Sequence, residues 1–108
     1  MIEFTTPDFI FHVVSSDVDL TKATKVFLTL KQGSYVRTFE EDHLTITEHD
    51  IRLWLDQNEI SKFKSDGSAV EVQLNWVYPD EDGVRMKRAA TTIQNFKISR
   101  NLLRKVIE

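Results

Sequence analysis

Hydrophobic and polar residues alternate along most of this 108-residue chain. The clearest case is VEVQLNWVY, residues 70–78, where every second residue from Val70 to Tyr78 is apolar and those between are mostly polar. Alternation with a period of two is the signature of a half-buried β-strand. Strands with one polar face are typical of antiparallel sheets. The pattern therefore predicts an antiparallel sheet that covers a core on one side.

The same alternation recurs at six other places, and turn residues separate them. Gly33 suits a tight turn, and PDEDG, residues 79–83, suits a longer hairpin loop. About seven short strands at near-regular spacing predict an all-β fold, an antiparallel immunoglobulin-like β-sandwich in preference to a closed barrel. We expect one domain over residues 1–108. The further strands are expected at residues 9–14, 25–31, 35–40, 44–46 and 51–55, and after residue 83.

The last predicted strand does not keep one phase. Met86 and Phe96 share a parity that Ile93 does not. A β-bulge near Gln94–Asn95 would bring these apolar side chains to consistent faces. After this strand, NLLRKVIE, residues 101–108, spaces its apolar residues four apart, which predicts a short C-terminal helical turn.

A short segment between two strands departs from the alternating rhythm. In LWLDQNEISKF, residues 53–63, Asp56 precedes Glu59 by three positions, which is the spacing of a capping box. Leu55 before the cap and Ile60 after it form the pair expected of a hydrophobic staple. The segment therefore predicts one capped helical turn that carries the chain from one sheet to the other.

Composition and charge narrow the classes of partner. The chain has no cysteine, so thiolate catalysis, thiolate metal sites and disulfides are excluded. A net charge of −3 argues against a nucleic-acid partner, and we interpret RMKR, residues 85–88, as a solvated strand face. The start of the chain lacks the basic region of a signal peptide. No apolar run approaches the roughly 20 residues that span a bilayer, so no membrane partner is expected.

No residue pattern indicates an enzyme or a cofactor. His43 and His49 lie among acidic residues, but they flank a predicted strand and would not converge on a metal ion. The carboxylates of residues 39–42 and 79–83 fall in predicted turns, where solvation is the usual outcome. His12 is expected on a sheet face or edge. We predict that the chain has no catalytic residue, no metal site and no cofactor.

Two aromatic residues and one arginine are the candidate contact residues. Trp54 and Arg52 share the face of their strand opposite its apolar positions. If this face is exposed, Trp54, Arg52 and Tyr35 form a candidate interaction surface, because aromatic and arginine side chains anchor interfaces. The alternative is that a neighbouring loop covers Trp54. Trp76 lies on the apolar face of its strand and is expected in the core.

Several loose motifs, spread over nearly the whole chain, resemble one group of proteins. They are TTPDFIFHV, VFLTLKQG, IRLWLDQNEISKF, VEVQLNWVYPDEDGVRM and NLLRKVIE. The pattern resembles small phage and prophage proteins of Firmicutes, which look similar to immunoglobulin-like modules of phage tails and baseplates, such as the N-terminal domain of baseplate upper proteins. The matching positions are Thr5, Thr6, Pro7, Phe11, Thr29, Gln32, Leu55, Gln57, Glu59, Phe63, Gln73, Leu74, Trp76, Gly83, Leu103 and Ile107.

The resemblance implies a structural or accessory role in virion assembly and no catalysis. It implies partners among other phage structural proteins or a second copy of this chain, and a location in the virion or, before assembly, in the host-cell cytoplasm. One departure is RAATT, residues 88–92, where the group often has a serine early in the last strand. The alternative function is a ligand-binding module that recognises a host-surface glycan through exposed aromatic residues.

Overall fold

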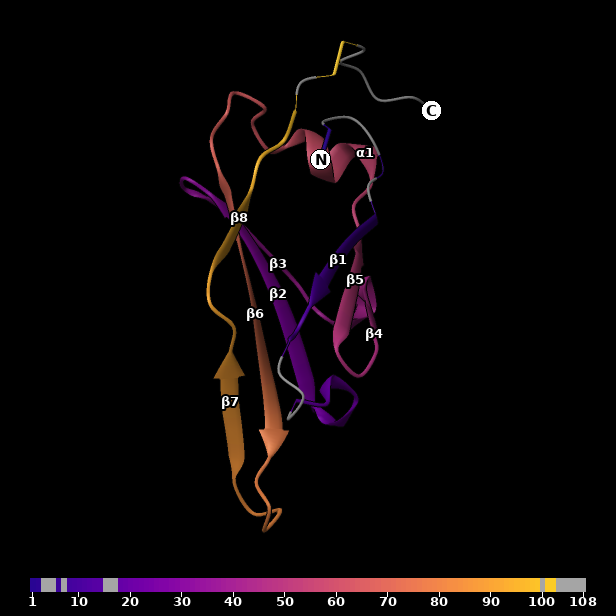
Figure 1. Cartoon of the computed structure of the whole chain (residues 1–108), viewed down its shortest axis with the longest axis vertical. Coiled ribbons are helices and arrows are strands. Elements are labelled where there is room, and N and C mark those ends of the chain that lie inside the picture. Colours follow the sequence, from indigo (N-terminus) through magenta and orange to yellow (C-terminus); the bar gives the residue numbers. More distant parts are fainter. Residues whose placement is uncertain (3–5, 7, 15–17, 100, 103–108) are drawn as a thin grey trace.

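The fold is an antiparallel β-sandwich of two unequal sheets, seen in a computed structural model (Figure 1). The structure describes residues 1–2, 6, 8–14, 18–99 and 101–102. The small sheet has the order β1-β5-β4, and the large sheet has the order β3-β2-β6-β7, with β8 also paired to β6. The small sheet comprises β1 (Asp8–His12), β4 (Leu44–Ile46) and β5 (Asp50–Trp54). The large sheet comprises β2 (Lys25–Gln32), β3 (Tyr35–Phe39), β6 (Val70–Pro79), β7 (Met86–Ala90) and β8 (Gln94–Phe96).

This architecture confirms the predicted β-sandwich. The described residues form eight strands rather than about seven, because the last expected strand divides into β7 and β8. Among the described strands, β1 lies at an edge of the small sheet, and β7 and β8, which both pair with β6, lie along an edge of the large sheet. Two short 3-10 helices complete the connections, η1 (Leu20–Lys22) and η2 (Glu41–His43). Within the described residues, no helix is long and apolar enough to cross a membrane.

The core lies between the facing sides of the two sheets and follows the alternation read from the sequence. Each fully buried leucine, valine or phenylalanine side chain contributes roughly 1.5–3 kcal/mol relative to exposure. Trp76 is 8% exposed, which confirms its predicted place in the core. The buried hydrophobic residues are Phe11, Val13, Leu20, Val26, Leu28, Leu30, Phe39, Ile51, Leu53, Leu55, Ile60, Phe63, Val70, Val72, Leu74, Trp76 and Ile98.

The helix α1 (Gln57–Ser61) joins the small sheet to the large sheet, as predicted. The Glu59 backbone N–H donates to Asp56 Oδ1 at 2.7 Å, and the Asp56 N–H donates to Glu59 Oε1 at 3.3 Å. These two bonds are the predicted capping box. Leu55 and Ile60, the predicted staple pair, are both buried. The cap therefore fixes the direction in which the chain leaves β5.

The edge strand of the large sheet changes register between β7 and β8. β7 ends with Ala90 opposite Asn75, and β8 begins with Gln94 opposite Val72. Three residues separate the two ends on this strand and two separate them on β6, so the edge strand holds one extra residue. An extra residue on one strand of an antiparallel pair is a β-bulge.

The position predicted for this bulge was wrong. The sequence placed it near Gln94–Asn95, whereas it lies at residues 91–93. Thr91 decides the position, because its N–H donates to the Leu74 carbonyl oxygen at 2.9 Å and its hydroxyl accepts the Leu74 N–H at 3.1 Å. The predicted C-terminal helical turn falls largely on residues 103–108, outside the described residues.

Candidate interaction surface

The outer face of the small sheet presents the most exposed aromatic side chain among the described residues. β5 is the central strand, with β1 on one side and β4 on the other. Ile51 and Leu53 point inward and are fully buried, so Arg52 and Trp54 point outward. Trp54 is 75% exposed, and Arg52 is also exposed. Of the two environments left open for Trp54, the structure has the exposed one.

Pairing with the neighbouring strands extends this outer surface. Arg52 lies opposite Ile10 on β1 and opposite Thr45 on β4. Ile10 is 54% exposed, although isoleucine is usually found inside proteins. Directly opposed residues of an antiparallel pair point to the same side, so these side chains lie together. We name this cluster the Trp54 face, formed by Ile10, Thr45, Arg52 and Trp54.

Trp54 stands between two surface hollows. One has a volume of about 300 Å³ and runs along the β4 side of the indole; the other has a volume of about 410 Å³ and runs toward the start of α1. The capping box holds the walls of the second hollow, because Asp56 and Glu59 bond each other's backbone. The first is lined by Asp42, His43, Leu44, Thr45, Arg52 and Trp54. The second is lined by Thr6, Trp54, Leu55, Asp56 and Glu59.

The third candidate contact residue, Tyr35, lies elsewhere. It begins β3 in the large sheet and is half-buried. Its ring packs against that of Phe63, with 5.0 Å between the ring centroids. The structure therefore brings Arg52 and Trp54 together and places Tyr35 in a different environment, against the segment that follows α1.

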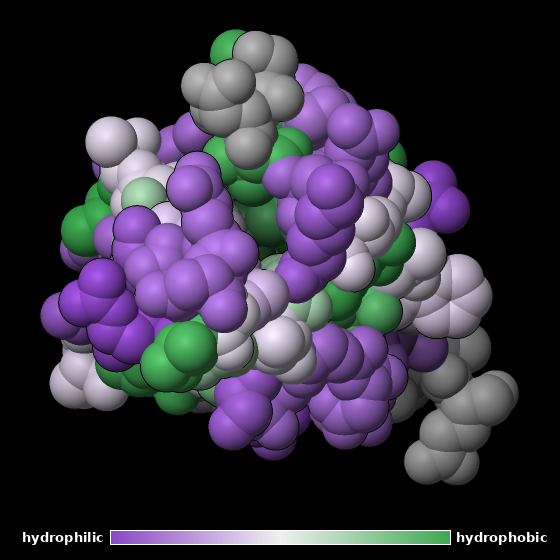
Figure 2. Space-filling view, turned by 90° about the horizontal axis from the view of Figure 1, so that it is seen from below, coloured by the Kyte–Doolittle hydropathy of each residue, from purple (hydrophilic) through white to green (hydrophobic). Residues whose placement is uncertain are grey.

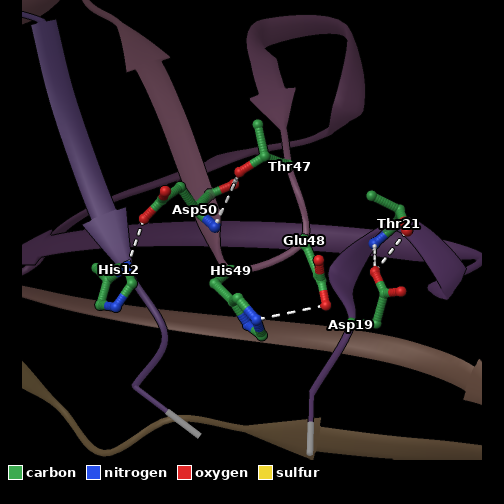
Figure 3. Close-up of polar contacts among 7 residues, drawn as sticks. All are labelled: His12, Asp19, Thr21, Thr47, Glu48, His49 and Asp50. Atoms are coloured by element: carbon green, nitrogen blue, oxygen red, sulfur yellow. Dashed lines mark hydrogen bonds and ion pairs between the residues drawn. The ribbon is translucent and has the colours of Figure 1, made fainter. Parts of the chain in front are cut away.

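Histidines and carboxylates gather around the β4–β5 turn, as Figure 3 shows. His12 Nδ1 lies 2.5 Å from Asp50 Oδ1, and His49 Nε2 lies 3.5 Å from Glu48 Oε1. Within the turn, the Thr47 hydroxyl accepts the Asp50 N–H at 3.2 Å. These contacts tie the turn to itself and to the end of β1.

Backbone bonds from the segment after β1 hold the same turn. The Val13 N–H donates to the His49 carbonyl oxygen at 2.7 Å, and the Leu20 N–H donates to the Glu48 carbonyl oxygen at 2.9 Å. Beside it, hydrogen bonds from the Thr21 hydroxyl and N–H hold the pKa of Asp19 below its ordinary value, since they favour the charged carboxylate (Figure 3). Within the described part of the chain, no group of three or more histidine and acidic side chains is placed to hold a metal ion. The backbone bonds thus attach the β4–β5 turn to the segment that connects β1 with β2.

The sequence reading missed Ile10 as a member of the Trp54 face. Its alternation with Phe9 and Phe11 already placed it on the opposite side of its strand, which was the available signal. Alternation does not predict the register between strands, so it could not show that Ile10 pairs with Arg52, 42 positions further along the chain.

Comparison with known proteins adds no relative. No protein-family model, no curated protein and no solved structure matches this chain.

Proposed function

We propose that this protein is a non-enzymatic protein–protein interaction module that binds its partner through the Trp54 face. The single observation that carries the proposal is the 75% exposure of Trp54 beside exposed Arg52 and Ile10 on one sheet face. Tryptophan and arginine dominate the energetic centres of protein interfaces. Apolar side chains that are exposed together on one face, rather than singly, favour a surface that becomes buried on binding.

The sheet geometry supports the proposal, because it makes the Trp54 face rigid. Arg52 projects from the central strand where it is paired on both sides, and Trp54, which ends this strand, is paired with β1. A rigid platform loses little conformational entropy on binding. The sequence resemblance supports a partner among the structural proteins of a phage tail or baseplate, so we propose a structural or accessory role in virion assembly.

Site-specific photo-crosslinking in phage-producing cells tests this function. A photoreactive amino acid at position 54 should crosslink to a tail or baseplate subunit, identified by mass spectrometry. The matched control places the same group at Thr38, which is exposed on the outer face of the large sheet. Equal crosslinking from both positions, or crosslinks from position 54 to no virion protein, would contradict the proposal.

A second candidate function follows from the two hollows beside Trp54. An exposed indole offers a flat apolar surface for a sugar ring, and hollows of about 300 and 410 Å³ reach the lower range of small-ligand sites. A glycan array with the wild-type protein and with Trp54→Ala separates this function from protein binding. Array signals that are present for the wild type and lost in Trp54→Ala would support glycan binding. An array without signal for the wild type would exclude glycan binding as the function.

A further inference from the structure

A small hollow lies where the β2–β3 turn meets the segment that follows α1. Its volume is about 240 Å³, below the roughly 300–1,000 Å³ of sites for drug-sized ligands, so it suits a compact group. Both walls lie toward the end of the molecule that holds α1 (Figure 1). The lining residues are Gln32, Gly33, Ser34, Tyr35, Lys62, Lys64 and Ser68.

A buried glutamine fixes the two walls of this hollow against each other. Gln32 lines the hollow from the end of β2 and is only 7% exposed. Its side-chain amide bonds the backbone of Lys64 and of Ser68 on the opposite wall. The Tyr35 ring packs on Phe63, which attaches the start of β3 to the same segment. The hollow is therefore preformed, and a ligand would not have to order its walls on binding.

The charged side chains that line the hollow are lysines. Lys62 and Lys64 are exposed, and within the described residues neither forms an ion pair. No carboxylate is among the described lining residues. The acidic residue nearest in sequence, Asp66, accepts the Ser68 N–H at 3.0 Å in its own turn. Since a hollow lined by one sign of charge attracts the opposite sign, this one favours an anion, although the whole chain carries a net charge of −3.

Hydroxyl groups add neutral donors beside the two ammonium groups. Ser34, Tyr35 and Ser68 each bring a hydroxyl to the lining. In the part of the chain that the structure describes, neither the Ser34 nor the Tyr35 hydroxyl is hydrogen-bonded to a protein group. A hydroxyl donates one hydrogen bond and an ammonium group three. The hollow therefore offers donors in excess, which calls for a ligand with several acceptor oxygens.

We propose that this hollow, which we name the Lys62–Lys64 hollow, binds a phosphoryl group, either as inorganic phosphate or as the phosphate of a small organic ester. A phosphate monoester carries a charge of about −1.5 to −2 at neutral pH, which two lysines balance. Its oxygens accept strong charge-assisted hydrogen bonds from ammonium groups and further bonds from hydroxyls. A carboxylate has one charge and two oxygens, so it would leave donors of this hollow unused.

This site is separate from the Trp54 face. None of the residues that line the Lys62–Lys64 hollow belongs to that face, which lies on the outer side of the small sheet. Tyr35, grouped with Trp54 on the sequence alone, instead lines the hollow. Trp54→Ala should leave phosphate binding unchanged, so the two proposals can fail independently.

Titration followed by amide chemical shifts in NMR spectra tests the site. The wild-type protein is titrated at neutral pH and constant ionic strength with inorganic phosphate, with glycerol 3-phosphate and with acetate, each up to about 50 mM, which detects millimolar affinity. We expect saturable shifts of the signals of residues 32–35 and 62–68 with a phosphate compound and none with acetate. Tighter binding of the ester would assign the site to an organic phosphate, and tighter binding of inorganic phosphate would assign it to the free anion. No saturable shift with either phosphate compound, or equal shifts with acetate, would overturn the proposal.

Two matched pairs of lysines separate a specific site from the effect of net charge. Lys62→Gln with Lys64→Gln should weaken phosphate binding at least about 10-fold, while the backbone bonds from the buried glutamine amide to position 64 remain. The control, Lys22→Gln with Lys25→Gln, removes the same charge at exposed positions outside the hollow. Lys25 pairs with Val77 toward the β6–β7 hairpin, at the end of the molecule that Figure 2 views, where hydrophobic side chains lie between hydrophilic ones.

The control pair should keep the dissociation constant for phosphate within about 3-fold of the wild type, because screening weakens charges at that distance. Equal weakening by both pairs would show a response to net charge alone and would overturn the proposal. Amide spectra without ligand confirm that both variants keep the wild-type fold.

Discussion

The side-chain amide of Gln32 pairs with both backbone groups of Lys64. Gln32 Oε1 accepts the Lys64 N–H at 2.6 Å, and Gln32 Nε2 donates to the Lys64 carbonyl oxygen at 2.8 Å and to the Ser68 carbonyl oxygen at 3.2 Å. Gln32 is only 7% exposed, so these bonds lie away from water. The amide thus attaches the segment after α1 to the end of β2.

Gln32→Ala should lower the free energy of unfolding by about 1–3 kcal/mol, because it leaves part-buried backbone groups of Lys64 without their partner. Urea denaturation of the purified domain measures this change. The control is Gln94→Ala, at an exposed position of β8, which should change stability by less than about 0.5 kcal/mol. Equal stability of the two variants would refute the role of Gln32.

Removal of the α1 cap should destabilise the fold; Asp56 and Glu59 line one hollow beside Trp54, but partner binding through the Trp54 face should persist. Asp56→Ala deletes the acceptor of the Glu59 N–H and should lower stability by about 0.5–2 kcal/mol. Asp56→Ser keeps a capping oxygen and should retain most of the stability. Glu59→Ala removes the reciprocal bond and should behave similarly. If folded Glu59→Ala protein lost partner binding, Glu59 would instead belong to the contact surface.

The two tryptophans should respond oppositely to substitution. Trp54→Ala should leave stability within about 0.5 kcal/mol of the wild type, since the ring is mostly exposed. It should weaken partner binding by at least about 2 kcal/mol. Trp76→Ala should lower stability by about 3–5 kcal/mol, because the ring is buried.

Thermal unfolding and binding to the crosslinked partner, measured side by side for both variants, check this contrast. A Trp54→Ala protein that unfolds as readily as Trp76→Ala would show that Trp54 supports the fold rather than the interface.

The Asp80 carboxylate in the β6–β7 loop gives a pH-dependent prediction. The Glu81 N–H and the Lys87 ammonium hold the pKa of Asp80 below its ordinary value of 3.8. A lowered pKa in the folded state means that the carboxylate stabilises the fold above pH 3.8 and loses this contribution as the pH falls through the folded-state pKa. The stability difference between the wild type and Asp80→Asn should therefore shrink on acidification. If this stability difference stayed constant from neutral pH to below the folded-state pKa of Asp80, the stabilising role of the Asp80 carboxylate would be contradicted.

Local features of this fold were predictable from the sequence because their causes are local. Alternation gave the strands, since successive side chains of a strand point to opposite faces. The capping box at Asp56 and Glu59 predicted α1, because both of its bonds join residues three apart. The polar parity of Arg52 and Trp54 likewise predicted that they share a face.

Contacts between distant residues were not predictable in the same way. The bulge was misplaced because Thr91 fixes it by bonding the backbone of Leu74, on another strand. Tyr35 was grouped with Trp54 because both are aromatic, and residue type alone does not tell where a side chain lies in the fold. Only the tertiary structure, in which Tyr35 packs against Phe63, shows that the two residues lie in different places.

The sequence by itself determined which side of each strand is apolar, where the chain turns, and where one helix begins. The tertiary structure alone decided that Ile10 joins Arg52 on the Trp54 face and that the β6–β7 hairpin extends beyond the small sheet. The physical reason is that alternation sets the direction of a side chain within its own strand. Register and strand length, which depend on pairing with distant segments, set its neighbours.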